Sequence, residues 1–335
     1  MKSKIVLFGE YLLRLTPPHN QTLVQAEKLD MHWAGSEANI AVSLSIFGEN
    51  AEYISSMPDN SLTRTGISQL HKYGVKTDIL LKDNSRVGLY FFESGQGARP
   101  GRVSYDREHS ALSQTRPGDL DWHRIFEGAS WFHWSGITPA LNENTAAVCL
   151  EALQIAKERG ITISADFNHR ATLWNYGKQP SEVMPDLLQY CDVILADADT
   201  SALYFGIEFD ENNIVKSTCQ QLQDKLPDVG YIAMTMRNQI SASSNGYTGY
   251  LWKNGELITS RDYQIDNIAD RIGAGDAFMS GIIYGLHNNH SMKDTIEFAT
   301  ACGVMKHFIT GDFNLATKNE IDTLIRQKGS GRIIR

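Results

Sequence analysis

The chain of 335 residues lacks any continuous apolar run long enough to cross a bilayer, and its first residues lead into a short apolar segment without the core of a signal peptide. It is also poor in cysteine, with no CxxC pair among its four: Cys149, Cys191, Cys219 and Cys302. Cysteines spaced so widely favour small buried side chains in a reducing compartment over disulfides or a metal site. We therefore expect a cytoplasmic protein.

Basic residues are in deficit, with 31 lysines and arginines against 39 aspartates and glutamates, a net charge of −8. A negative surface repels nucleic acid and anionic membranes, so we expect neither as a partner. Any anionic ligand must be bound by a local group of side chains.

Two common phosphate-binding motifs are absent. No GxxxxGK[ST] sequence is present, and Gly95-Gln96-Gly97 lies in a predicted hairpin without a following helix. Neither a P-loop nor a dinucleotide-binding turn is therefore supported.

The clearest chemical signal that is present lies in residues 270–278, DRIGAGDAF, which lead into the apolar helical segment 279–286. Gly273 and Gly275 have no Cβ, so the backbone can turn sharply and direct several N–H groups at one point, next to the positive end of the helix dipole. Asp276 lies in the first helical turn, where its carboxylate suits a base that accepts a proton from a hydroxyl. The pattern indicates phosphoryl transfer, and the alternative is a glycine-rich helix start capped by an acid.

Short apolar strands alternate with amphipathic helical patterns along most of the chain. The strands are expected at 5–8, 51–56, 76–81, 130–134, 162–166, 192–196, 231–236 and 240–251, and the helices at 36–47, 61–73, 145–159, 183–190, 215–225, 293–308 and 318–327. Within the helix of residues 277–285, Ala277, Gly281 and Gly285 form a small-residue stripe for close packing. This rhythm predicts one α/β domain over residues 1–335, with a mostly parallel sheet, helices on both faces and a loose tail at 329–331.

Two segments interrupt the rhythm. Residues 11–34 and 86–108 each read as a β-hairpin, and we expect them to form one small sheet, a lid over the site. The aromatic residues Tyr90, Phe91 and Phe92 predict an exposed apolar face that needs cover, so we also expect a homo-oligomer formed through this lid.

The chain resembles the ribokinase-like, or pfkB, carbohydrate kinases from Lys4 to about Gln327, on the residues 35–39 (GSEAN) and 270–278. The resemblance implies a three-layer α/β/α fold and transfer of a phosphoryl group from MgATP to a sugar. It makes Asp276 the general base, and it assigns the backbone amides of Gly273, Ala274 and Gly275 to the anion hole. It places Gly35, Ser36 and Asn39 on the sugar, and Asn168, Thr235, Arg237, Gly273 and Gly275 near the nucleotide.

Four local matches resemble the branch of this family that phosphorylates 2-keto-3-deoxygluconate: Arg271, residues 105–111, residues 166–174 and residues 306–314. By this likeness the substrate is a sugar acid, and the residues that contact it include Tyr90, Tyr105, Arg107, Arg170 and Asp312. The alternative for each arginine is an ion pair at the surface. Alternative functions are a kinase for fructose or another sugar, and a catalytically silent sugar sensor.

The metal ligands stay open. Where the family commonly has Asn-x-x-Glu, this chain has Asp197-Ala198-Asp199-Thr200. Asp197 or Asp199 is a candidate to replace the missing ligand, and a helix N-cap is the alternative. Dependence on a monovalent cation is open as well.

Overall fold

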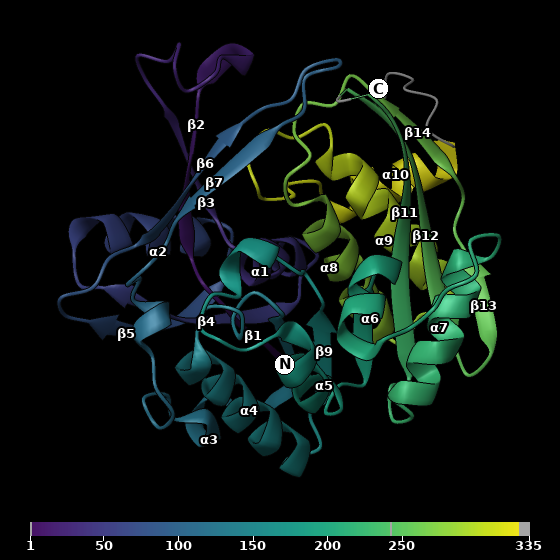
Figure 1. Ribbon diagram of the computed structural model, residues 1–335, viewed down its shortest axis with the longest axis horizontal. Helices are drawn as coiled ribbons and strands as arrows, with labels where there is room; N and C mark the ends of the chain where they lie inside the picture. Colours follow the sequence, from purple (N-terminus) through teal and green to yellow (C-terminus); the bar gives the residue numbers. More distant parts are fainter. Residues whose placement is uncertain (1, 242, 328–335) are drawn as a thin grey trace.

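The computed structural model describes residues 2–241 and 243–327 and shows a large sheet between two layers of helices, with a smaller sheet at one side (Figure 1). The expected three-layer α/β/α fold is therefore confirmed. The loose tail expected at 329–331 lies outside the described residues.

The described residues form a 10-stranded main sheet. Its strand order is β13 (Glu256–Thr259), β12 (Ser244–Lys253), β11 (Tyr231–Ser241), β10 (Val193–Ala196), β9 (Thr162–Asp166), β8 (Ala129–Ser135), β1 (Lys4–Phe8), β4 (Asn50–Pro58) and β5 (Lys76–Lys82), and β14 (Tyr263–Asp266) pairs with β12. Along this order, each pair of neighbouring strands from β11 to β5 is parallel. In contrast, β12 pairs antiparallel with β11, β13 and β14. The carboxyl ends of the parallel strands thus meet along one edge.

Helices cover both faces of this sheet. Side chains of β1 alternate between the two layers, since Ile5 and Leu7 belong to one core cluster and Val6 and Phe8 to the other. The first layer holds α1 (Ser36–Ile46), α2 (Ser61–Lys72), α8 (Ala274–His287), α9 (Met292–Lys306) and α10 (Lys318–Gln327). The second holds α3 (Trp122–Ile125), α4 (Glu143–Glu158), α5 (Pro180–Leu188), α6 (Ala198–Phe205) and α7 (Ile214–Lys225).

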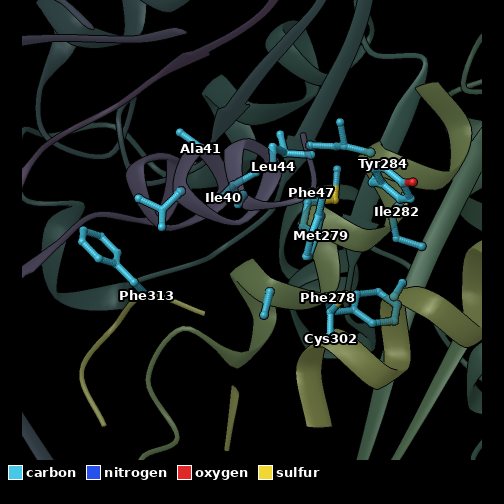
Figure 2. Close-up of a cluster of buried hydrophobic side chains, with 14 of the residues drawn as sticks. Ile40, Ala41, Leu44, Phe47, Phe278, Met279, Ile282, Tyr284, Cys302 and Phe313 are labelled. Atoms are coloured by element: carbon cyan, nitrogen blue, oxygen red, sulfur yellow. The ribbon is translucent and has the colours of Figure 1, made fainter. Parts of the chain in front are cut away.

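The first layer is held by a dense apolar cluster between α1, α8 and α9 (Figure 2). Phe47 follows the end of α1, and its ring packs edge to face against that of Tyr284 in α8, with 5.5 Å between the ring centroids. Along α8 the predicted small-residue stripe meets α9, because a Cβ on Gly281 would collide with Ala299 and one on Gly285 with Thr295. This packing holds the start of α8 firmly beneath the carboxyl edge of the sheet.

The two inserted segments form one four-stranded sheet, in the order β3 (Asp30–Ala34), β2 (Leu12–Thr16), β6 (Gly88–Glu93) and β7 (Arg102–Asp106). β2 and β6 are parallel and join the two hairpins. The expected aromatic face is wrong in part: Tyr90 and Phe92 are buried, and only Phe91 lies on the opposite side of the strand. Alternation of side chains along a strand separates the three rings.

The structure contains some helices and strands that the sequence analysis did not predict. The structure adds α3, α6, β13 and β14, and short 3₁₀ turns at Pro18–Asn20, Leu112–Gln114 and Ala171–Leu173. The strand expected across 240–251 is instead the end of β11 followed by β12. Within the described ranges, every helix is too short or too polar to cross a membrane. All four cysteines are buried and unpaired, as expected.

Candidate active site

A cavity of about 810 Å³ opens at the carboxyl edge of the main sheet, between the small sheet and the start of α8. The side chains and turns predicted from the sequence converge there from segments far apart in the chain. Its lining includes every residue assigned to catalysis, the sugar or the nucleotide: Gly35, Ser36, Asn39, Tyr90, Tyr105, Arg107, Asn168, Arg170, Thr235, Arg237, Gly273, Ala274, Gly275, Asp276 and Asp312.

Asp276 lies in the first turn of α8 and faces this cavity. Its two carboxylate oxygens accept hydrogen bonds from Ser36 Oγ at 2.6 Å and Asn39 Nδ2 at 2.7 Å. Asn168 Nδ2 in turn donates to Ser36 Oγ at 2.9 Å. Burial raises the pKa of Asp276, and the two hydrogen bonds oppose that rise. The carboxylate is therefore oriented by both partners and is more basic than an exposed aspartate, as a general base requires.

The two glycines of the turn before Asp276 have different surroundings. Gly273 has a φ of 82°, and a Cβ there would collide with the carbonyl oxygen of Asp312. Gly275 has open space where a Cβ would point, on the cavity side. Because the first N–H groups of a helix have no intrahelical acceptor, this turn offers backbone donors and the positive end of α8 to an anion.

The two predicted arginines differ in their environments. Arg107 is 5% exposed and donates from Nε to Glu10 Oε2 at 2.8 Å, with a second bond from Nη2 to the same oxygen. Its charge is thus already balanced by Glu10. Arg170 is exposed at the cavity and donates to the carbonyl of His169 at 3.0 Å, and no carboxylate pairs with it in the described part of the chain. Arg170 is the more available partner for an anionic ligand.

Asp312 is buried at the cavity floor between the small sheet and the glycine turn. It accepts hydrogen bonds from Tyr90 OH and from Arg14 Nη1, the latter at 3.0 Å. Burial raises its pKa to about 6, and the Arg14 guanidinium opposes that rise. Arg14 Nη2 also pairs with Asp270 Oδ2 at 2.8 Å, just before the glycine turn.

Comparison with known proteins places this geometry in a family. Residues 2–311 match the model of the pfkB family carbohydrate kinases. The chain belongs to this family. As kinases of this family use ATP, the enzyme is an ATP-dependent sugar kinase.

Three relatives of this kinase illustrate the match. The crystal structure of 2-dehydro-3-deoxygluconokinase from Thermotoga maritima is 36% identical with a TM-score of 0.92, over 97% of this chain and 99% of that one. A putative 2-keto-3-deoxygluconate kinase from Enterococcus faecalis is 29% identical with a TM-score of 0.90, over 100% and 99% of the two chains. A 2-dehydro-3-deoxygalactonokinase from Haloferax volcanii is 29% identical over 99% of both chains.

Residues that the resemblance placed near the nucleotide line the cavity beside the glycine turn. Thr235 and Arg237, in the middle of β11, line the cavity together with Arg271. Asn168, which the resemblance also placed near the nucleotide, lines the cavity and donates its side-chain amide to Ser36. In this structure Asn168 therefore supports the residues around Asp276.

Two carboxylates of the cavity fit a magnesium ion carried in with ATP. Asp166, buried below Asn168, has its pKa raised to about 8 by burial and by the charge of Asp276. Asp197 Oδ1 accepts the N–H of Thr200 at 2.8 Å, so Asp197 is the helix N-cap that the sequence offered as the alternative, and it also lines the cavity. Asp199 is absent from the cavity lining. No cluster of three candidate ligands exists within the described ranges. Mg²⁺ that enters with a nucleotide is usually held by one or two carboxylates plus phosphate oxygens.

Sequence reasoning missed the buried partners of the predicted residues. Glu10 and Arg14 follow the first strand, and Asp270 precedes the glycine turn, yet none has a spacing that indicates its contact. A buried charge in an apolar strand, such as Arg14 in LLRLT, is the one available signal, since it requires a partner.

Proposed function

We propose that this kinase phosphorylates 2-keto-3-deoxygluconate at its terminal hydroxyl, giving the 6-phosphate, with Asp276 as general base. The observation that carries the catalytic assignment is the Asp276 carboxylate, fixed by Ser36 and Asn39 at the start of α8, beside the glycine turn. A base and an anion site a few atoms apart suit the two ends of phosphoryl transfer.

In the reaction, Asp276 takes the proton of the sugar hydroxyl as its oxygen attacks the γ-phosphorus. The bond from that phosphorus to the bridging oxygen breaks, and ADP leaves with the electron pair. The amides of the turn at Gly273, Ala274 and Gly275 stabilise the charge on the transferred group. Asp166 and Asp197 would hold a magnesium ion bound with ATP, and that ion would neutralise phosphate charge.

The acidic substrate is supported by Arg170, whose guanidinium is exposed to the cavity without a carboxylate partner. Tyr90 and Tyr105, from the small sheet, add a hydroxyl and a ring face that suit a polyol. Relatives named for 2-dehydro-3-deoxygluconate and 2-dehydro-3-deoxygalactonate point to the same substrate class. We further propose that the small sheet closes over the bound sugar as a lid.

The test is a coupled ADP-release assay with 2-keto-3-deoxygluconate, 2-keto-3-deoxygalactonate, fructose and ribose. We expect the highest kcat/KM with 2-keto-3-deoxygluconate. Higher activity with fructose would contradict the acidic substrate. A higher kcat/KM with 2-keto-3-deoxygalactonate would keep a keto-deoxy acid as the substrate but change which epimer is assigned.

A further inference from the structure

Lys306, the last residue of α9, is a buried charge that the proposed reaction does not use. Its exposed fraction is 0%, and its side chain runs beneath the glycine turn. A Cβ on Gly273 would lie 3.3 Å from Lys306 Cε. The methylene stem therefore fills the space directly below the turn that carries the proposed anion site.

The ammonium group has few direct partners. Lys306 Nζ donates to the carbonyl of Ile309 at 2.8 Å, and it forms no ion pair within the described part of the chain. The nearby carboxylates of Asp270 and Asp312 are both bonded to Arg14, at 2.8 and 3.0 Å. Arg14 thus occupies the carboxylates that would otherwise pair with Lys306.

Such an arrangement is unfavourable for stability. Burial lowers the pKa of Lys306, and the charges of Asp270, Asp312 and Asp276 oppose that change only through space. A buried ammonium without a bonded carboxylate destabilises the folded state relative to an apolar side chain of similar volume. Packing alone would favour methionine at this position, so the charge itself calls for a role.

We propose that Lys306 is a positioning residue for the anion site: it holds the Gly273 turn on the 309–312 loop, and its positive charge supports the turn amides as they receive the transferred phosphoryl group. The inference rests on the proposed assignment of the turn as an anion site. Two buried cations, Arg14 and Lys306, lie near the two buried carboxylates Asp270 and Asp312, and Arg14 is bonded to both carboxylates. Lys306 is the cation of this group without a carboxylate bond, so its field is the one available to an incoming phosphate.

The main test replaces the charge and keeps the volume. In Lys306→Met we expect kcat to fall about 10²-fold, the scale for losing one anion-hole donor, while KM for the sugar stays near the wild-type value. The thermal midpoint should stay the same or rise, because an unfavourable buried charge has been removed. The matched control is Lys293→Met on the same helix, whose side chain is 58% exposed and which should keep wild-type kcat.

Lys306→Ala provides an independent readout, because it leaves space for a small cation below the turn. Ammonium chloride should restore part of its kcat, compared with sodium chloride at equal ionic strength, and should not raise the rate of wild type or of Lys306→Met. A side chain that only fills space would show no such restoration.

The assays use whichever sugar wild type phosphorylates best, so a wrong substrate does not affect them. Wild-type kcat in Lys306→Met, or no response of Lys306→Ala to ammonium, would overturn the role of Lys306. If Asp276→Asn also kept wild-type kcat, the proposed active site itself would be wrong. If Asp276→Asn lost turnover, only the proposed role of Lys306 would be wrong.

Discussion

At the scale of single residues, the kinase depends on how a few carboxylates and cations are partnered. Asp276 and Arg170 both face the cavity, yet Asp276 accepts two hydrogen bonds, whereas Arg170 donates none to a carboxylate of the described residues. Asp276 is therefore held in one orientation, whereas the guanidinium of Arg170 is available to a ligand.

Replacing Asp276 with asparagine should lower kcat by several orders of magnitude, because the amide cannot accept the hydroxyl proton. Sugar binding, measured by calorimetry, should change little. Asn39 Oδ1 has no hydrogen-bond partner, so a flip of the Asn39 amide provides an acceptor for the new side chain. Near-normal turnover in this variant would exclude Asp276 as the base.

Arg170→Ala should reduce kcat/KM for the keto acid about 10- to 100-fold, which corresponds to the roughly 1.5 to 3 kcal/mol of a hydrogen bond to a charged group. A neutral sugar should be affected far less. Arg64→Ala, on an α2 side chain that is 71% exposed, serves as the control. Equal losses on acid and neutral sugars would argue against a carboxylate contact.

Arg107 makes a poorer test of the same idea. Its removal would leave Glu10 buried without a countercharge, and a loss of stability would then accompany any loss of binding.

Glu37, next to Ser36 in α1, should make stability depend on pH. Burial raises its pKa to about 7, above the usual value near 4.5. The folded protein therefore holds this proton more tightly than the unfolded chain, and the free energy of unfolding should fall as pH rises from about 4.5 to 7. In urea titrations, Glu37→Gln should remove the part of this fall that Glu37 contributes, about 3 kcal/mol at most, while the raised pKa values of Asp166 and Asp312 maintain the rest. An unchanged pH profile would contradict the assignment to Glu37.

At the scale of elements, the site depends on how closely α8 lies against α9. Gly281 allows the two helices to approach until its own backbone contacts Ala299. That approach fixes the helix whose first turn carries Asp276.

Gly281→Ala should therefore destabilise the protein by about 1 to 3 kcal/mol, as expected for overpacking a dense core, measured by chemical denaturation. Gly275→Ala is the matched control on the same helix, since nothing lies within 4 Å of the position of its new Cβ. It should keep wild-type stability. If both variants lost similar free energy of unfolding, the cause would be a general effect of alanine in this helix and not the contact with Ala299.

At the scale of the whole molecule, the small sheet projects from the main domain (Figure 1) and keeps apolar side chains at its surface. Met31 is 63% exposed and Val103 41% exposed, on its two edge strands β3 and β7. An exposed edge of this kind favours association with a second copy of the chain.

We therefore expect a homo-oligomer at micromolar concentration in solution scattering, with the small sheet in the interface. Met31→Asp should shift it toward monomer without loss of stability, while Leu81→Asp, at a 50% exposed position on β5 of the main sheet, should not. A monodisperse wild-type monomer would contradict this prediction.

Local sequence patterns were enough to predict the alternating layers of the fold and the chemistry of the glycine turn. Both depend on residues that are close in the chain: apolar strands and amphipathic helices show their own periodicity, and Gly273, Gly275 and Asp276 occupy one turn. Short elements such as α6 and β13 carry too few residues to show a period, and β13 is fixed mainly by pairing with β12.

Which charges are available to a ligand depends on the tertiary structure. Glu10 neutralises Arg107 from 97 positions away, and Arg14 reaches Asp312 across 298 positions. The burial of Lys306 below the turn likewise results from the packing of α9 beside α8. Partner choice between buried charges depends on distance and solvent exclusion in the folded chain, and neither quantity is encoded in local spacing.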